Sequence, residues 1–578
     1  MVRLNVKEWL SAKIEDERIR YWLWFVVLAS GLLLIYGHLF YLDPFLSYDD
    51  PRVISPMEPV HSWHDYWSRV KSAEIVDLQP VRDFVTWVDY LILSYFKLST
   101  FHFTNVVLWF SCILCFRKLL LVILDRKSKW VELFTLYVAF NPLYVTSIAW
   151  LSSRKHLLAA LFILMASIRL FEYTKQQRKG VFGLTLFYTL AVFSQPIVVG
   201  WPLWLGVVLY LNGKPKVREL VVFLPLFLIM LATVILNYKY YNGEQYLLIS
   251  GGFTKYNDQI NNFNVKLFMF GRYFLQVLIP YWVSFTVYSF ASLQNVIGIF
   301  LLPVGIYLFW KCLGLRTTMI WFSFYMVILC PVILKMTQIP GHDTYLCAAG
   351  FGIFVLLFLL FEKTENHLRT GYRALIILGL TSICFFHSYQ KSQLWASEFS
   401  VFEDAYHTEG GLQASLNYAG VLMEAKRYKE AVWITEDLYR TIPNLDQVQS
   451  VLAFAIVTSD EFTPEKKAEM LRKFNFTAPR PLAFLGDMEA QMEHYEVAEN
   501  LLIAALKHKE RRSLLRGGAE KLGVELYRRC RFGSKKNCVQ KLKMVRGVDI
   551  VIPWSEAAFE DGLRSVNLLE AYQTESKN

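Results

Sequence analysis

Metal-binding cysteine patterns are absent from this 578-residue chain. Its eight cysteines form neither CxxC pairs nor a Cys/His spacing typical of zinc sites, which excludes a zinc module of the cysteine-rich kind. Six of them lie in or beside apolar segments, where a small buried hydrophobe is the ordinary role of cysteine. The other two, Cys530 and Cys538, are able to form a disulfide if their domain lies in an oxidising compartment.

Long apolar runs are absent from residue 391 onward, although they fill the chain before it. Between residues 21 and 390 such runs recur at about 17–22 residues each, the length that crosses roughly 30 Å of hydrocarbon. Hydrophobic residues make up 54% of the chain, against about 45–50% in soluble proteins. We therefore expect an all-α fold, with a polytopic membrane domain at 21–390 and a water-exposed helical domain at 391–578.

We also expect no cleavable signal peptide, because residues 1–20 are charged and the first apolar run is long enough to remain as an anchor. We expect residues 1–20 to be a cytoplasmic segment. About eleven membrane spans follow in the prediction: 21–42, 102–124, 131–150, 155–173, 180–194, 196–212, 219–238, 295–312, 318–336, 344–362 and 374–390. The apolar stretch 267–285 is interrupted by Pro280, and we expect it to return to the face from which it enters.

The net charge of +11 comes largely from short loops between the predicted spans. Lys and Arg concentrate in cytoplasmic loops of membrane proteins, so this distribution indicates topology and not a nucleic-acid partner. The eleven-span prediction places all of these loops on the cytoplasmic side: 116–129, 175–179, 212–218, 311–316 and 362–373. It places the first external loop, 43–83, and the C-terminal domain on the opposite side.

The C-terminal domain carries a spacing typical of tetratricopeptide repeats. Ala419, Ala431 and Pro443 lie twelve residues apart, and the offset recurs between Gly486 and Ala498. Small residues at these offsets let two antiparallel helices pack closely. Stacked helix pairs of this kind form a concave surface that holds an extended peptide. The alternative is that the helices only cap the membrane domain.

Several blocks of the chain, in order, resemble the polyprenol-phosphate-sugar-dependent glycosyltransferases of the C superfamily. The most similar group is that of the O-mannosyltransferases, which join a multi-span domain to tetratricopeptide repeats. The blocks that carry the resemblance are "YDDPRVI" (48–54), "PVRDFVTWVDYLILSYFKLSTFHFTNVVLW" (80–109), "FNPLYVTSIAWLSSRKHLLAALFIL" (140–164), "VFSQPIVVGWPLWL" (192–205), "GRYFLQVLIP" (271–280), "HDTYLCAAGFG" (342–352) and "SQLWASEFSVFEDAY" (392–406).

The resemblance implies transfer of a hexose, mannose or another, from a polyprenyl-phosphate donor to a Ser/Thr hydroxyl of a protein, with inversion, on the extracytoplasmic side. Such a reaction needs a carboxylate opposite the leaving group, cations for the phosphate and an apolar groove for the prenyl chain. The expected catalytic residues are Asp49 and Asp50, the phosphate-binding residues Arg154, Lys155, Arg272 and Arg82, and the pocket-lining residues His342, Asp343, Tyr345 and His156.

A divalent cation, Mg²⁺ or Mn²⁺, is an open expectation, and the partners expected are the lipid-linked donor, membrane lipids and an acceptor protein held by the repeats. The compact loops favour a bacterial inner membrane with the C-terminal domain in the periplasm, or the ER membrane and lumen in a eukaryote.

Two alternatives stay open. Where the family shows His-Pro-x-His, this chain has Asn141-Pro142-Leu143-Tyr144, which favours a non-catalytic, membrane-anchored repeat scaffold. A transporter of the lipid-linked sugar is disfavoured because no inverted repeat is evident.

Overall fold

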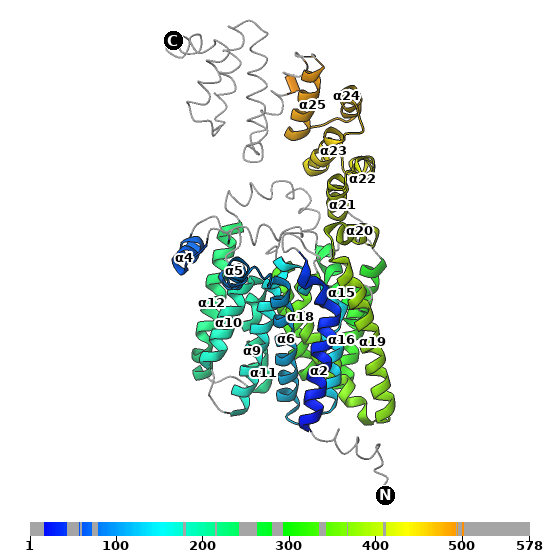
Figure 1. Cartoon of the computed structure of the whole chain (residues 1–578). Coiled ribbons are helices and arrows are strands. Elements are labelled where there is room, and N and C mark those ends of the chain that lie inside the picture. Colours follow the sequence, from blue (N-terminus) through cyan, green and yellow to red (C-terminus); the bar gives the residue numbers. More distant parts are fainter. Residues whose placement is uncertain are drawn as a thin grey trace. The chain divides into compact units, whose positions relative to one another are not determined.

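Every regular element in the part of the chain that we describe is a helix, as the sequence predicted. The computed structural model describes residues 17–42, 57, 60–71, 79–176, 181–213, 217–241, 263–279, 293–333, 343–366, 368–408 and 412–492, with isolated positions up to 501. The described helices divide into two compact units on either side of Gly410 (Figure 1). We call them the membrane unit and the C-terminal unit. The membrane unit thus extends about twenty residues beyond the predicted boundary at 390.

The described helices of the membrane unit are, in chain order, α2 (Glu17–Tyr36), η1 (Gly37–Tyr41), α4 (Trp63–Lys71), α5 (Pro80–Phe96), α6 (Phe101–Leu124), α7 (Trp130–Ala139), η3 (Pro142–Tyr144), α8 (Val145–Ala149), η4 (Leu151–Ser153), α9 (Arg154–Gln176), α10 (Val181–Ser194), η5 (Pro196–Gly200), α11 (Trp201–Asn212), α12 (Val217–Tyr241), α15 (Phe263–Leu278), α16 (Leu293–Leu313), α17 (Leu315–Ile333), η7 (Asp343–Tyr345), α18 (Leu346–Lys363), η8 (Thr364–Asn366), α19 (Thr370–Leu394) and α20 (Glu398–Thr408).

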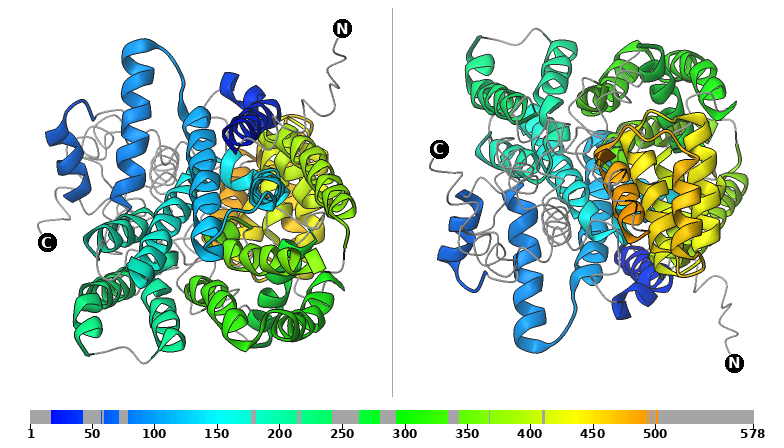
Figure 2. Two further views of the ribbon diagram at one scale, coloured as in Figure 1. Left: turned by 90° about the horizontal axis from the view of Figure 1, so that it is seen from below. Right: turned by 90° about the horizontal axis from the view of Figure 1, so that it is seen from above.

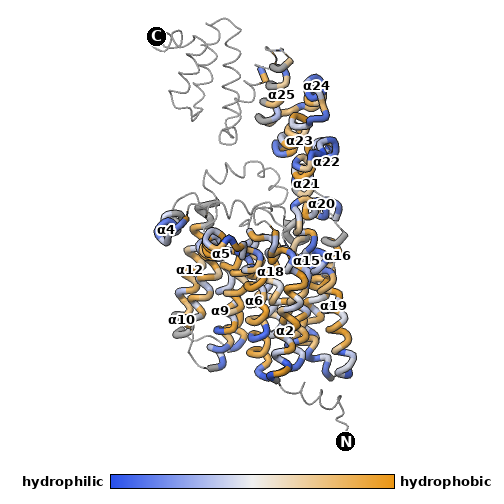
Figure 3. The backbone as a smooth tube through the Cα atoms, in the orientation of Figure 1, coloured by the Kyte–Doolittle hydropathy of each residue, from blue (hydrophilic) through white to orange (hydrophobic). Residues whose placement is uncertain are grey.

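Each of the eleven predicted spans coincides with a helix or a run of short helices in this unit. Six of the described helices are long and apolar enough to cross a membrane, and a bent pair brings the number to seven. Four further apolar helices are shorter, namely those at 181–194, 196–212, 223–236 and 315–331. Hydrophobic residues fill the middle of the bundle and hydrophilic ones its ends (Figure 3). The unit is therefore membrane-embedded, while the count of eleven crossings stays a prediction.

The predicted span 131–150 is not one helix. α7 ends at Ala139, and the chain continues through η3 and α8 with a bend of 46°. Asn141 starts the second part, because its Oδ1 accepts a hydrogen bond from the N–H of Leu143 at 3.0 Å and Pro142 follows at the first helical position. Non-helical backbone at membrane depth requires burial in protein, and every residue from 134 to 154 is buried.

Helix α5 was not predicted as an element, and its two faces are reversed compared with a helix on a water-soluble protein. It buries Arg82, Asp83 and Asp89, whereas Phe84 and Tyr95 are 40% and 71% exposed. α5 is seen end-on in Figure 1 and lengthwise in Figure 2, so it lies across the bundle axis. An exposed apolar face with a buried charged face is the arrangement that lipid favours. We infer that the outer face of α5 contacts the bilayer.

Helix α4 joins α5 through stacked aromatic rings. Tyr66 and Trp87 are stacked with centroids 5.3 Å apart, and Trp63 contacts the same pair. The Tyr66 hydroxyl donates a hydrogen bond to the carbonyl of Pro80 at 2.6 Å. Burial raises the pKa of Tyr66 to about 12, so this hydroxyl stays a donor at physiological pH.

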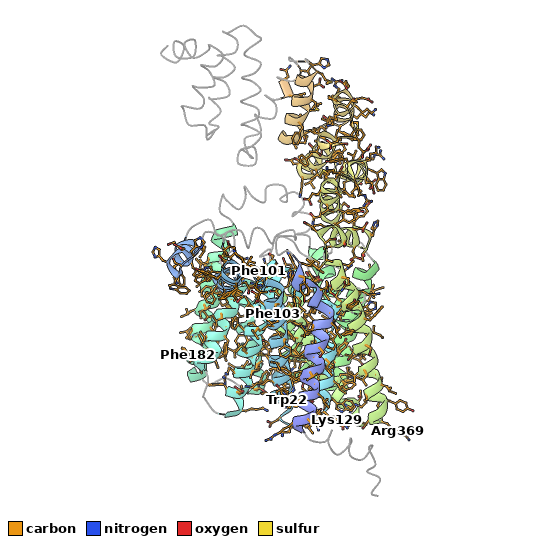
Figure 4. All side chains as sticks on the ribbon, viewed as in Figure 1. Trp22, Phe101, Phe103, Lys129, Phe182 and Arg369 are labelled. Carbon is orange, nitrogen blue, oxygen red and sulfur yellow. The ribbon has the colours of Figure 1, made fainter. Side chains whose placement is uncertain are left out.

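The basic loops meet at one end of the membrane unit, where Figure 4 labels Lys129 and Arg369. We call this the basic end. Contacts between the loops link all five of them: Arg126 with Glu362 at 3.0 Å, Lys175 with Asp125 at 2.8 Å, Arg316 with Asn212, and Lys363 with the carbonyl of Cys312. The loops that the sequence placed together are therefore together. Which compartment this end faces stays a prediction.

The C-terminal unit consists of successive packed helices: α21 (Leu412–Glu424), α22 (Tyr428–Thr441), α23 (Asp446–Thr458), α24 (Pro464–Arg472) and α25 (Pro479–Gln491). Ala419 and Ala431, predicted as small residues between two helices, are completely buried. Gln449 fixes the turn after α24, because its Oε1 accepts hydrogen bonds from the N–H groups of Thr477 and Ala478 at 2.9 and 2.7 Å. The helical hairpins agree with the expected architecture, and the tetratricopeptide identity of the repeats stays a prediction.

Candidate functional site

The predicted catalytic pair, Asp49 and Asp50, lies outside the described residues, and so do His342, Cys530 and Cys538. The described chain on either side of the acid pair is attached to one end of the membrane unit. Phe40 contacts Phe103 of α6 with ring centroids 5.5 Å apart. Trp87 Nε1 of α5 donates to the carbonyl of Val60 at 2.9 Å. We call this end, labelled by Phe101 and Phe103 in Figure 4, the acid-loop end.

Arg154 is completely enclosed at the acid-loop end and is held by an ion pair. Its NH2 lies 2.7 Å from Oδ2 of Asp89 and donates to the carbonyl of Phe101 at 2.8 Å. Its Nε donates to Oδ1 of Asn105 at 2.9 Å. Arg154 is the first residue of α9, so these bonds join α5, α6 and α9. The charge predicted to bind a phosphate is thus balanced by a protein carboxylate.

The second oxygen of Asp89 is also occupied. Its Oδ1 accepts hydrogen bonds from the hydroxyls of Thr100 and Thr104, both at 2.7 Å. Asp89 and Arg154 are both almost completely buried. A buried ion pair is stable only when its remaining polar atoms are satisfied, and the two threonines at the start of α6 meet part of that requirement. Asp89 was not among the residues expected from the sequence.

Arg82, another predicted phosphate ligand, is paired with its own neighbour. Its Nε and NH2 lie 2.8 and 2.7 Å from Oδ1 of Asp83, and both residues are on the buried side of α5. Lys155 differs from both arginines, because it is half-buried beside the buried Arg154. The phosphate-binding roles of these residues stay predictions, and the two arginines have a structural role in the described fold.

The break in the predicted third span frees carbonyls that other helices bind. Ser388 of α19 donates to the carbonyl of Phe140 at 2.8 Å, and Trp109 of α6 donates to that of Ala139 at 3.1 Å. Asn105 donates to the carbonyl of Ile148 at 3.0 Å. Each donor replaces a bond that a continuous helix would have made within itself. The segment 140–153 is therefore held in one conformation.

Asp343 lies against this segment with half of its carboxylate unused. Its Oδ2 accepts a hydrogen bond from the Thr146 hydroxyl at 2.7 Å, and the residue is 1% exposed. Its Oδ1 has no hydrogen-bond partner among the described residues. The positive charge of Lys391 on α19 also acts on this carboxylate. A buried carboxylate oxygen without a donor is costly, and a hydroxyl-bearing ligand would relieve that cost.

The other pocket-lining candidates lie near Asp343. Tyr345 is two residues along η7, and its ring meets that of His156 edge-to-face with centroids 5.5 Å apart. Within the same 140–153 segment, the buried hydroxyls of Tyr144 and Ser153 have no hydrogen-bond partner in the described part. Buried polar atoms in proteins are usually satisfied. The structure thus brings Asp343, Tyr345 and His156 together beside a segment able to bind polar ligands.

Arg272 is buried on α15, at 1% exposure, as expected for a charge inside an apolar run. One turn later on the same face lies Gln276, also 1% exposed, whose amide nitrogen and oxygen both lack a hydrogen-bond partner among the described residues. The sequence prediction missed Gln276. Its signal was the i, i+4 spacing from Arg272 within an otherwise apolar stretch.

No group of three metal-ligating side chains occurs within the described ranges. The described residues around Asp343 therefore do not by themselves form a site for a divalent cation. The cation expectation rests on Asp49 and Asp50, which are not described, and it stays open.

Comparison with known proteins gave no match: no family model, no curated protein and no solved structure is significantly similar to this chain. The resemblance to the C-superfamily glycosyltransferases therefore rests on the short sequence blocks alone and stays a prediction.

Proposed function

We propose that this protein is a membrane glycosyltransferase that moves a hexose from a polyprenyl-phosphate donor to a hydroxyl of an acceptor protein on the extracytoplasmic side. The acceptor oxygen attacks the anomeric carbon, the bond from that carbon to the phosphate oxygen breaks, and polyprenyl phosphate leaves. The acceptor proton passes to a carboxylate, for which Asp49 or Asp50 is the candidate.

The observation that carries the proposal is the state of Asp343. The Thr146 hydroxyl fixes one carboxylate oxygen at 2.7 Å, and the other oxygen is buried without a donor. A carboxylate held in this way is suited to accept a hydrogen bond from a sugar hydroxyl, and the low-dielectric surroundings strengthen that bond. We assign Asp343 to binding the donor sugar and not to removing the proton.

The position of the acid-bearing loop also supports the proposal. Helix α8 connects the two parts of the site: its Thr146 holds Asp343, and the carbonyl of its Ile148 is bound by Asn105, which also holds Arg154. Leu42 packs against the core of the membrane unit, and Val60 accepts a hydrogen bond from Trp87 of α5. These two residues flank the acid pair in the sequence, and their contacts support a site shared by the acid pair and Asp343.

Mass profiling of exported proteins tests the proposal. Cells carry the wild type, Asp343→Asn, Asp49→Asn/Asp50→Asn, or Glu362→Gln. We expect the double variant to lose a hexose-sized mass from at least one exported protein, and Asp343→Asn to lower its occupancy roughly tenfold, because one charge-assisted hydrogen bond is lost. The control, Glu362→Gln, changes a buried carboxylate at the basic end and keeps full occupancy.

A different set of masses would decide against the enzyme. Unchanged glycan masses in the double variant, with the protein still folded and present in the membrane, would leave the membrane-anchored repeat scaffold as the better explanation. Equal losses in Asp343→Asn and Glu362→Gln would show that the effect is one of folding and not of the site.

A further inference from the structure

Helix α15 carries two polar residues on the face that packs into the bundle. The buried apolar residues of that face are Met269, Tyr273 and Val277, each at most 4% exposed, and Arg272 and Gln276 lie among them. Positions spaced by three and four residues share one side of a helix. Polar side chains in the core-facing stripe of a membrane helix are costly and mark ligand pathways.

A close backbone contact fixes α15 in place. Gly271 and Gly298 of α16 approach so closely that a Cβ added to Gly271 would lie 2.4 Å from the backbone nitrogen of Ile299. Phe274 lies against Gly305 in the same way, because a Cβ there would lie 2.5 Å from its ring. α16 thus closes one side of α15, and Arg272 and Gln276 are presented from a rigid element.

Gln276 has one N–H₂ donor group and one carbonyl acceptor, and neither is used by the described part of the protein. Leaving such a group buried without partners is unfavourable compared with an apolar side chain of the same shape. An amide kept at this position is therefore better explained by a ligand than by packing.

We propose that Gln276 and Arg272 bind the sugar–phosphate junction of the lipid-linked donor, which rests on the proposed function. The guanidinium of Arg272 is suited to two phosphate oxygens at once. The Gln276 amide nitrogen donates to a phosphate oxygen, and its carbonyl accepts from a sugar hydroxyl. A glycosyl phosphate offers both kinds of partner within one group, whereas a free phosphate monoester at neutral pH offers chiefly acceptors. Gln276 thus distinguishes a loaded donor from the spent carrier.

The test compares Gln276→Met with wild type by thermal unfolding of the full chain in lipid nanodiscs, with mannosyl polyprenyl phosphate, unglycosylated polyprenyl phosphate or inorganic phosphate added. We expect Gln276→Met to raise the melting temperature without ligand, because the unpartnered amide is removed. We expect it to bind the mannosyl lipid about tenfold more weakly and to lose the preference for it over the unglycosylated lipid.

The matched control is Gln79→Met. Gln79 is also buried, but its Nε2 donates to Oε1 of Gln195 at 3.0 Å. This variant is expected to melt at a lower temperature and to keep the wild-type response to the mannosyl lipid. A Gln276→Met variant that behaves like Gln79→Met would overturn the proposal.

The same data separate the lipid donor from free phosphate. If inorganic phosphate gives the same Gln276-dependent shift as the mannosyl lipid, the sugar–phosphate assignment is wrong. Donor binding lost in Gln276→Met, in a protein that transfers no glycan in cells, would uphold this site and contradict the glycosyltransferase. Glycan transfer in cells together with unchanged binding of the mannosyl lipid by Gln276→Met would uphold the glycosyltransferase and contradict this site.

Discussion

The two ends of the membrane unit bury carboxylates in different ways. At the basic end, Glu132 lies 2.7 Å from Arg117, and Glu362 lies 3.0 Å from Arg126, whose side chain is 61% exposed. At the acid-loop end, Asp89 is paired with an arginine that is itself buried, and Asp343 accepts a hydrogen bond from the Thr146 hydroxyl.

The difference lies in how far the cation of each pair is exposed. Arg126 is 61% exposed, so its pair with Glu362 is screened by water and contributes little to stability. Arg117, which pairs with Glu132, is 17% exposed and is intermediate. The ion pair at the acid-loop end is shielded from solvent, and each partner depends on the other. Asp343 differs from both cases, because it is buried, accepts a hydrogen bond from the Thr146 hydroxyl and has a second oxygen without a hydrogen-bond partner among the described residues.

The largest effect should come from breaking the buried pair. Asp89→Asn leaves the guanidinium of Arg154 enclosed without its counter-charge, which costs roughly 3–5 kcal/mol for a pair of this kind. Thermal unfolding in nanodiscs should show it, and the double variant Asp89→Asn/Arg154→Gln should recover part of the loss. If Asp89→Asn lowers the stability no more than Glu362→Gln does, the two ends do not differ in how strongly their ion pairs stabilise the fold.

A smaller effect is expected at the basic end. Glu362→Gln removes an ion pair with a largely exposed arginine, and the hydrogen bond from Ser128 at 2.6 Å has a remaining acceptor. We expect a loss of about 1 kcal/mol or less, which decreases further in high salt. A loss of several kcal/mol of stability that does not depend on salt would show that the ion pair at the basic end is as shielded from solvent as the pair at the acid-loop end.

The smallest effect concerns the C-terminal unit, which uses the same device as the basic end. Arg472, about half exposed, donates to both oxygens of the buried Glu489 at 2.6 and 2.7 Å, and this holds the pKa of Glu489 below its ordinary value of 4.5. The stabilisation is complete above the ordinary pKa and is lost as the pH falls through the lowered one.

Hydrogen exchange of the full chain measures this pH dependence. Amides of α24 and α25 should exchange faster, relative to those of α21, as the pH falls below 4, after correction for the intrinsic rate. Glu489→Gln should abolish the difference. Faster exchange on raising the pH would contradict the assigned sign.

The sequence predicted the helices of the bundle well because apolar length alone determines them. It also predicted that the basic loops lie together, since the charge pattern depends only on chain order. It missed α5, whose Arg82, Asp83 and Asp89 face inward while Phe84 and Tyr95 face outward. Such a helix has too many charges to be recognised as a span.

The surroundings of the candidate site residues could not be predicted from the sequence, for a physical reason. Residue type suggested that Arg154 and Arg82 bind a phosphate, but a guanidinium is equally suited to a carboxylate of its own protein. Only the three-dimensional structure shows that Asp89 and Asp83 occupy them. Gln276 was missed because an amide carries no charge, and its importance comes from the absence of a hydrogen-bond partner among the described residues.

The break after α7 also has a consequence for the order of assembly. Ser388, which binds the carbonyl of Phe140, is 248 residues further along the chain, and Ser392 of the same helix binds the carbonyl of Ile35 at 2.7 Å. α19 is synthesised after all the other predicted spans. Until α19 is made, the carbonyls of Ile35 and Phe140 lack these two hydrogen-bond donors. The packing of the first helices therefore depends on a helix near the end of the membrane unit, and the bundle reaches its final form only when nearly the whole unit has been synthesised.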